Sequence, residues 1–196
     1  MENNLQDILK SVRARTDLLL SDPEAIALLK LARESSSKKG SFAEVGVYKG
    51  GSALLISEVK GLKDLYLFDT FEGIPYVDLS LDVGFKRGQY SESFLKVIDL
   101  FKNYKSVFVI PGDFRETMRF VDQKTFSFVH IDVDVFWSAL DSIIFFLTHL
   151  DQDGVILIHD IGAPGIRKAL SFLKDLKMKG IPNTSYGEIS LESASG

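Results

Sequence analysis

Acidic and imidazole side chains follow two apolar runs in the second half of the chain. Asp132 and Asp134 come after the run 126–131, and His159 and Asp160 end a later run. Because the carboxyl ends of parallel strands meet at one edge of a sheet, these side chains are expected to converge there. Converging carboxylates repel one another unless a proton or a cation lies between them. Their oxygens suit Mg²⁺ or Ca²⁺, and an imidazole also tolerates Mn²⁺.

These positions predict a divalent metal site formed by Asp132, His159 and Asp160. The alternative is that the acids only cap the helices that follow, and for Asp134 we favour this capping role. His130 lies inside an apolar run and is predicted to be a hydrogen-bonded core residue rather than a catalyst.

A glycine-rich turn lies between an apolar run and a helical pattern near residue 50. Its glycines, Gly46, Gly50 and Gly51, let backbone N–H groups approach a bound ligand closely. The pattern is not G-x-G-x-x-G, because Tyr48 occupies the second glycine position, and it lacks the lysine of a phosphate loop. Glu44, two residues before the first glycine, suits a ligand with a positively charged amino-acid part. A turn without any ligand is the simpler alternative.

Two further strand ends extend this candidate ligand site. Asp69 follows the run 65–68, about 20 residues after the turn, where a carboxylate accepts hydrogen bonds from ribose hydroxyls. The alternative is that Asp69 caps the turn after its strand, and we favour the ribose role. Asp113 and Phe114 follow the next run and could supply an acceptor for an adenine amino group and an apolar face for its ring. For Asp113, a helix N-cap role is an equal alternative.

Strand and helix patterns alternate along the chain and predict a mostly parallel sheet with helices on both faces. The predicted strands are 42–47, 65–68, 107–110, 126–131 and 155–158, with a further edge strand at 185–192. The predicted helices are 5–20, 22–33, 53–59, 93–102, 137–150 and 165–178. The segment 71–90 has few regular signals and is either a lid or an ordinary surface loop.

The composition is ordinary for a globular domain and excludes several function classes. The chain has 196 residues, a net charge of −4 and no cysteine. These values argue against a nucleic-acid surface, disulfides and thiolate ligands. The N-terminus lacks the regions of a secretory signal, and no apolar run approaches the ~20 residues that span a bilayer. We therefore expect a cytoplasmic protein without a membrane partner.

Several motifs together resemble the macrocin O-methyltransferase family. They are Glu44-Val-Gly-Val-Tyr-Lys-Gly-Gly-Ser52, Leu67-Phe-Asp-Thr-Phe-Glu-Gly73, Pro111-Gly-Asp-Phe114, Val129-His-Ile-Asp-Val-Asp134 and Gly154-Val-Ile-Leu-Ile-His-Asp160. They follow the family's order and spacing. The resemblance implies a class I, S-adenosylmethionine-dependent sugar O-methyltransferase with a Rossmann-like sheet and a divalent metal, usually Mg²⁺.

The resemblance also implies roles for single residues. The predicted cofactor-binding residues are Glu44, Gly46, Tyr48, Gly50, Gly51, Ser52, Asp69, Thr70, Phe71, Gly112, Asp113 and Phe114. Among them, Glu44, Gly46 and Ser52 are expected near the methionine part, Asp69 on the ribose, and Asp113 and Phe114 near the adenine. Asp132 is the predicted catalytic residue, and the predicted metal ligands are Asp132, His159 and Asp160.

The chain departs from the family at two places. Relatives often carry two acids where this chain has His159 and Asp160, and they have longer ends with lid and acceptor-binding elements. The predicted acceptor is a hydroxyl of a sugar or a sugar-containing small molecule. A catechol-like or other small diol, and a non-catalytic methyltransferase-like scaffold, are the alternatives.

The expected domain organisation is a single compact unit. Residues 1–40 are predicted to form N-terminal helices, and residues 41–196 the S-adenosylmethionine-binding domain. A homo-oligomer formed through the N-terminal helices is an open possibility.

Overall fold

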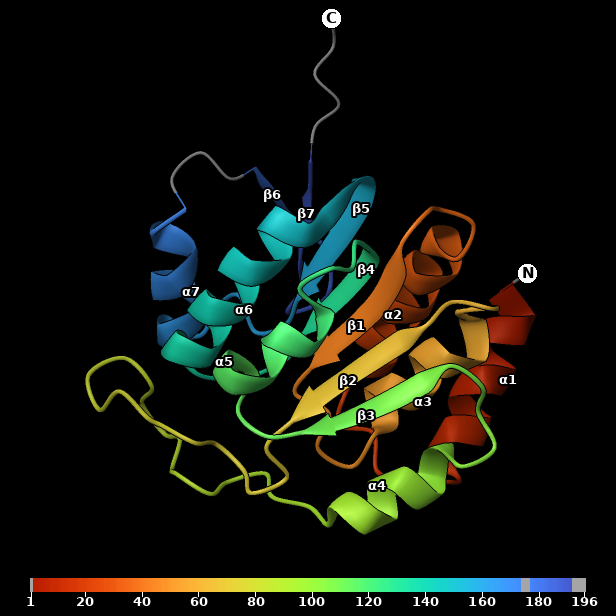
Figure 1. Cartoon of the computed structure of the whole chain (residues 1–196), viewed down its shortest axis with the longest axis horizontal. Coiled ribbons are helices and arrows are strands. Elements are labelled where there is room, and N and C mark those ends of the chain that lie inside the picture. Colours follow the sequence, from red (N-terminus) through yellow and green to blue (C-terminus); the bar gives the residue numbers. More distant parts are fainter. Residues whose placement is uncertain (1, 174–176, 192–196) are drawn as a thin grey trace, which may run out of the picture.

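A computed structural model describes residues 2–173 and 177–191 of the chain. Its centre is a seven-stranded sheet in the order β3-β2-β1-β4-β5-β7-β6 (Figure 1). The strands are β1 (Ser41–Val45), β2 (Leu65–Asp69), β3 (Val107–Pro111), β4 (Phe126–Ile131), β5 (Leu150–Ile158), β6 (Met178–Gly180) and β7 (Gly187–Ser190). The first five strands are parallel, and β7 and β6 are added antiparallel. The predicted α/β fold with a mostly parallel sheet is confirmed.

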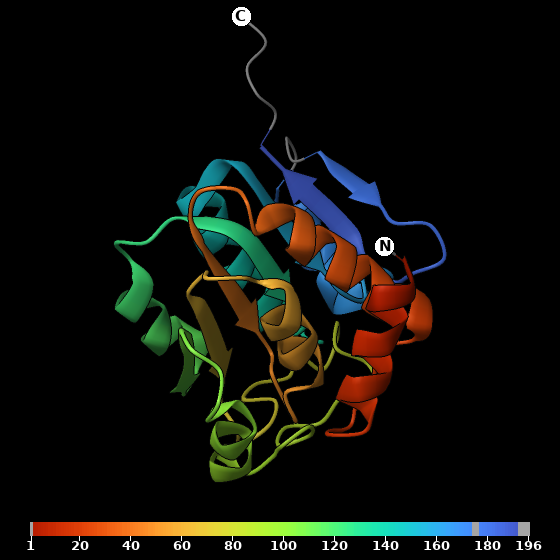
Figure 2. The ribbon, with the colours of Figure 1, turned by 90° about the vertical axis from the view of Figure 1, so that its right-hand side faces the viewer.

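Helices cover both faces of this sheet. One layer holds α1 (Glu2–Arg13), α2 (Asp22–Ser35), α3 (Gly51–Val59) and α4 (Phe94–Phe101), and the other holds α5 (Phe114–Thr117), the short 3₁₀ helix Met118–Val121, α6 (Phe136–His149) and α7 (Pro164–Ser171). Figure 2 shows α1 and α2 against the sheet, with the β6–β7 hairpin beside α2. Among the residues that the structure describes, every helix is too short or too polar to span a bilayer.

Successive residues of a strand point to opposite faces of the sheet and pack against one helical layer or the other. On β1, Phe42 packs with the first helical layer, and Ala43 and Val45 pack with the second. Every residue of β4 is buried, and so is every residue of β1 except Ser41 and every residue of β2 except Asp69. Burial on both faces favours apolar side chains, which is why these strands read as nearly unbroken apolar runs, with the buried Glu44 and His130 as polar exceptions.

The predicted first helix was too long. It was expected to reach Leu20 but ends at Arg13, because the chain then turns toward the glycine-rich segment. Thr16 donates its hydroxyl hydrogen to the Lys49 carbonyl at 2.8 Å, and the Arg13 guanidinium donates to the Leu20 carbonyl at 3.1 Å. The apolar residues that continued the helical spacing lie instead in a loop over the sheet edge.

The predicted last helix, 165–178, was also too long. It ends at Ser171, and Met178 begins β6, whereas residues 174–176 lie outside the described part of the chain. The predicted edge strand 185–192 is present as β7, and its last predicted residue lies outside the described residues.

The sheet order reverses at β1, with β2 and β3 on one side and β4 and β5 on the other. At such a switch point the connections leave in opposite directions and open a crevice at the carboxyl ends of the strands. The loops that carry most of the predicted site residues all start at this edge.

Candidate active site

A cleft of about 250 Å³ lies at the carboxyl edge of the sheet. The predicted site residues that line it are Gly46, Tyr48, Gly51, Ser52, Asp69, Thr70, Gly112, Asp113, Phe114, Asp132, His159 and Asp160. Three others, Glu44, Gly50 and Phe71, do not line it. Gly50 is the N-cap of α3, and the buried Phe71 ring packs against Phe94.

Gly46 brings the glycine turn directly onto the main chain of Asp132. Its φ is +89°, and a Cβ atom at this position would lie 1.8 Å from the Asp132 carbonyl oxygen. The Asp132 N–H donates to the Val45 carbonyl at 2.9 Å. Only glycine allows so close an approach in this backbone conformation, so the turn and the end of β4 are fixed against each other.

The Asp69 carboxylate organises the turn through main-chain donors. Its Oδ2 accepts from the N–H groups of Val47 at 2.7 Å and Tyr48 at 2.8 Å, and its Oδ1 accepts from the Phe71 N–H at 2.7 Å. Tyr48 and Phe71 have φ values of +49° and +56°, which are uncommon for residues other than glycine. A carboxylate has about four acceptor sites, so capacity for a further donor is left.

Glu44 is buried behind the cleft with His130 and Tyr186. Glu44 Oε1 lies 2.6 Å from His130 Nδ1, and Nε2 of that ring lies 3.0 Å from the Tyr186 hydroxyl. Burial raises the pKa of Glu44, although His130 opposes the rise. Oε2 of Glu44 is buried and has no hydrogen-bond partner among the described residues. The predicted core role of His130 is confirmed, and the ligand contact of Glu44 stays a prediction.

Asp113 caps a helix, as one of the two interpretations predicted. Its Oδ1 accepts from the Arg115 N–H at 3.0 Å at the start of α5. The Phe114 ring packs edge-on against Phe68 and stacks on Phe146, with ring centroids 5.1 and 5.4 Å apart. Both Asp113 and Phe114 still line the cleft, and their contact with an adenine stays a prediction.

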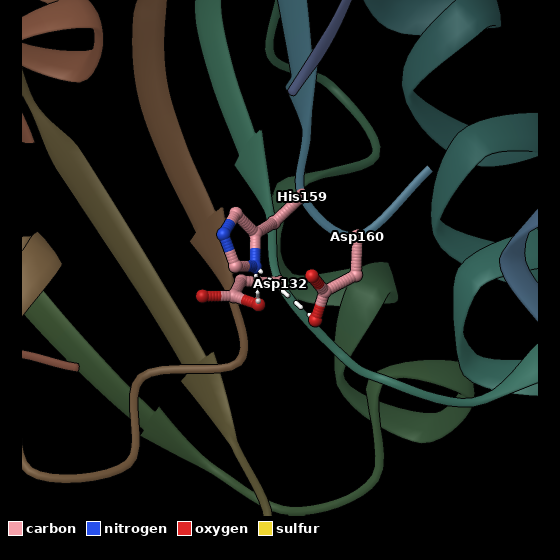
Figure 3. A group of neighbouring side chains, drawn as sticks. All are labelled: Asp132, His159 and Asp160. Carbon is pink, nitrogen blue, oxygen red and sulfur yellow. Dashed lines mark ion pairs between the residues drawn. The ribbon is translucent and has the colours of Figure 1, made fainter. Parts of the chain in front are cut away.

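Asp132, His159 and Asp160 form a cluster at the ends of β4 and β5 (Figure 3). His159 Nδ1 lies 3.2 Å from Asp132 Oδ1 and 3.4 Å from Asp160 Oδ2. One candidate ligand atom from each residue lies within 4.8 Å of the other two. The structure therefore brings these three residues together, and metal binding by them stays a prediction.

The cluster carries an excess of negative charge. Burial disfavours a charged His159, but Asp132 and Asp160 outweigh burial and raise the pKa of this imidazole to about 11. Burial, Asp132 and Asp160 together raise the pKa of Asp134 to about 7. Burial also acts to raise the pKa of Asp132, but the charged His159 outweighs it and lowers that pKa. The imidazole of His159 thus lies among four carboxyl groups, which belong to Asp132, Asp134, Asp160 and, at its other nitrogen, Glu24.

The predicted capping role of Asp134 was wrong. Asp134 adopts φ +63° in a tight turn in which the Val135 N–H donates to the Val133 carbonyl at 2.7 Å, and it lines the cleft. The N-terminus of α6 is capped from elsewhere, because Asp82 accepts from the Phe136 N–H at 2.8 Å. With the cap supplied by Asp82, Asp134 takes part in the acidic cluster.

The loop between β2 and α4 forms one wall of the cleft and is tied down at two places. At its stem, the Ile74 N–H donates to the Gln89 carbonyl at 2.8 Å and the Gly88 N–H to the Ile74 carbonyl at 2.9 Å. In its middle, the buried Asp82 caps α6 and accepts from the Asp78 N–H at 2.8 Å. The lid interpretation of this segment stays a prediction.

Two contributions from the N-terminal region were not predicted. The loop 17–20 lines the cleft, although its apolar residues had been assigned to a helix. Glu24 was not among the predicted site residues, yet its Oε1 lies 3.4 Å from His159 Nε2 and accepts from the Ser185 N–H at 3.1 Å. Burial opposes a charge on Glu24, but hydrogen bonds from Ser21 and Ser185 lower its pKa to about 2. No local sequence pattern predicts these contacts, because they join segments that are distant in the chain.

Comparison with known proteins gives a family match and a set of similar folds. The chain matches the macrocin-O-methyltransferase (TylF) family over residues 29–183. The search of curated proteins gave no match. Calicheamicin methyltransferase CalS11 superposes with a TM-score of 0.76 at 16% identity, over 98% of this chain and 93% of that chain.

Two further solved structures are similar. The O-methyltransferase NovP has a TM-score of 0.72 at 17% identity, over 87% of this chain and 80% of that chain. The SAH-bound Podospora anserina methyltransferase PaMTH1 has a TM-score of 0.66 at 15% identity, over 96% and 88% of the two chains. At these identities the structural comparisons establish the shared fold.

Proposed function

The chain belongs to the macrocin-O-methyltransferase (TylF) family, and we propose that it methylates a hydroxyl of a sugar-containing small molecule. Its family makes it an S-adenosylmethionine-dependent O-methyltransferase. The observation that carries the proposed site is the cluster of Asp132, His159 and Asp160, which opens into the same cleft as the glycine turn.

We propose that S-adenosylmethionine lies along the glycine turn, with its ribose at Asp69 and its adenine near Asp113 and Phe114. The spare acceptor capacity of Asp69 and the close backbone approach at the turn support this placement. Glu44 lies behind the cleft lining, so we propose that it acts on the ammonium group together with Ser52. The Ser52 hydroxyl lowers the pKa of Glu44 and itself lines the cleft.

The acidic cluster fits a divalent cation. Its donor set of two carboxylates and one imidazole suits Mg²⁺ or Mn²⁺. His159 Nδ1 is buried and lacks a well-formed hydrogen bond among the described residues, so this atom is available as a ligand. Burial first, and then the charges of Asp132 and Asp160, raise the pKa of Asp134 against the opposing effect of His159. We therefore propose Asp132, His159 and Asp160 as ligands, with proton and metal competing for Nδ1.

In the proposed mechanism, Asp132 accepts the proton of the acceptor hydroxyl. The pKa of Asp132 is lowered by His159 against the effect of burial, so its carboxylate is ionised at neutral pH. S-adenosylmethionine supplies a methyl group on a sulfonium, and a divalent cation supplies a Lewis acid that lowers the pKa of a bound hydroxyl. The contact between Gly46 and Asp132 holds the cofactor turn at a fixed position relative to this base.

A sugar-containing acceptor is favoured by the composition of the cleft. Acidic side chains dominate its charged lining, and its one lysine, Lys49, is paired with Asp17 at 2.5 Å. Such a lining suits neutral hydroxyl groups, which a cation at the acidic cluster would orient. Apolar residues of the loop 17–20 and of the loop after β2 form the wall for the remainder of the molecule.

An acceptor screen tests this proposal. The purified protein is incubated with S-adenosylmethionine and panels of glycosides and of catechols, with Mg²⁺ or with EDTA, and methylated products are detected by mass spectrometry. We expect a glycoside product that requires the cation. A product from catechols alone would support the alternative diol acceptor. Cofactor binding without any product would support a scaffold.

A further inference from the structure

We infer that Glu24, on α2, is a positioning residue that holds the His159 ring so that Nδ1 faces Asp132 and Asp160. The consequence for catalysis rests on the proposed function, whereas the contact itself does not. Glu24 lies before residue 29, where the family match begins.

The His159 ring presents its two nitrogens to different partners. Nδ1 faces the two aspartates of the cluster, and the other ring nitrogen points away from them (Figure 3). This second nitrogen, Nε2, is buried, and its charged neighbour is Glu24 Oε1, at the ion-pair distance of 3.4 Å and without a well-formed hydrogen bond. If the ring were rotated by 180° about the Cβ–Cγ bond, carbon atoms would take the places of both nitrogens and would face the aspartates and Glu24. A partner for Nε2 therefore selects the one orientation in which a nitrogen faces the cluster.

Glu24 is itself held in place, which a positioning role requires. Its Oε2 accepts from the Ser21 N–H at 2.9 Å and from the Ser21 hydroxyl at 2.7 Å, as part of the capping box of α2. Its Oε1 accepts from the Ser185 N–H at 3.1 Å. Only 8% of Glu24 is exposed. The carboxylate thus joins the start of α2 to the segment before β7 and leaves Oε1 beside the imidazole.

Tyr186 restrains the same ring by packing. Its fully buried ring meets His159 edge-on, with centroids 4.9 Å apart and planes at 64°. Ser185 and Tyr186 also lie outside the family-matched segment. An aspartate presents an oxygen to a cation in either orientation of its carboxylate, but an imidazole presents Nδ1 in only one. A histidine in this cluster therefore needs a neighbouring residue that fixes the orientation of its ring.

Nitrogen NMR of the histidine rings tests the contact without metal, cofactor or acceptor. The full chain contains three histidines, and His159→Asn identifies the resonances of His159. In the wild-type protein we expect an Nε2 proton of His159 that is protected from exchange. Glu24→Ala should remove this protection, whereas Glu24→Gln should keep it, because the amide oxygen can still accept from Nε2.

Mn²⁺ binding, measured by electron paramagnetic resonance, tests the consequence. Loss of a partner behind a metal-binding histidine weakens metal affinity by about 10–100-fold, so we expect this loss for Glu24→Ala and a much smaller one for Glu24→Gln. Ser21→Ala is the matched control, since it removes the hydroxyl that donates to Oε2 but keeps the Ser21 and Ser185 N–H groups that hold the carboxylate, with Oε1 beside the ring. It should lower the melting temperature while keeping the NMR signal and the Mn²⁺ affinity.

The outcomes separate this inference from the proposed function. An unchanged Nε2 signal in Glu24→Ala, or an equal loss of signal in Ser21→Ala, would overturn the positioning role. If the wild-type protein binds no Mn²⁺, the proposed metal site fails, and the NMR comparison alone decides the role of Glu24.

Discussion

Asp69 is the last residue of β2 and Asp132 directly follows β4, so both lie at the same edge of the sheet, but their surroundings differ. Asp69 accepts three main-chain N–H groups and so completes the turns beside it. Asp132 stands among Asp134, His159 and Asp160, where the carboxylates outnumber the cation. The proposed cofactor half of the cleft is therefore held by main-chain hydrogen bonds as folded, whereas the acidic half has unneutralised charge. From this difference we propose that one half contributes to stability and the other binds a cation.

Asp132→Asn changes only the acidic half of the cleft and should cause the largest loss of activity. Loss of a positioned base lowers kcat by about 10²–10⁴-fold, measured with an acceptor found in the screen. Binding of S-adenosylhomocysteine should stay close to that of the wild-type protein. Asp141→Asn, whose carboxylate pairs with Arg115 outside the cleft, is the control. Full activity of Asp132→Asn would contradict the assigned base.

Asp69→Ala breaks the cofactor half. Removing an acceptor shared by three N–H groups should lower the free energy of unfolding by about 2–4 kcal/mol and abolish binding of S-adenosylhomocysteine. Chemical denaturation and calorimetry measure these effects. Asp113→Ala, which removes a helix cap, should cost only about 1 kcal/mol. Equal losses of stability in the two variants would contradict the proposal that Asp69 stabilises the fold more than an ordinary helix cap does.

Adding Mg²⁺ should complete the acidic half and raise the melting temperature. A ligand at 100 times its dissociation constant stabilises the folded state by about 2.7 kcal/mol. Differential scanning calorimetry at neutral pH measures the shift, and EDTA should reverse it. The shift should be absent in Asp132→Asn. A shift of the same size in that variant would place the cation elsewhere.

Asp134→Asn should change how the stability of the protein depends on pH. The pKa of Asp134 is raised from 3.8 to about 7 in the folded state, so the folded protein holds this proton more tightly than the unfolded chain. Stability is therefore lost as the pH rises from about 4 to 7 and stays low above that range. The variant should be more stable than the wild-type protein at pH 8 by about 1–2 kcal/mol, because water in the cleft screens part of the shift. The gain should vanish near pH 4. A pH-independent difference would contradict this account.

The sequence predicted the parts of the molecule that depend on local pattern. Buried strands appear as apolar runs, and the topology then brings residues at their ends, such as Asp69, Asp132 and Asp160, to one edge. Glycine spacing likewise located the turn that approaches Asp132.

The errors arose where a distant segment decides the structure. Asp134 resembles a helix cap, but Asp82 from the preceding loop supplies that cap. The helical spacing up to Leu20 is interrupted because Thr16 bonds to the glycine turn. The contact between Glu24 and His159 joins segments far apart in the chain. Periodicity and capping rules describe neighbours in sequence and do not report such contacts.

Calorimetric titration with S-adenosylhomocysteine, in Mg²⁺ and again in EDTA, tests most directly whether the two halves are separate. We expect one binding site per chain under both conditions. Binding should persist in Asp132→Asn and disappear in Asp69→Ala. Absence of binding in the wild-type protein would contradict the cofactor site. Loss of binding in EDTA and in Asp132→Asn would show instead that the two halves form one dependent unit.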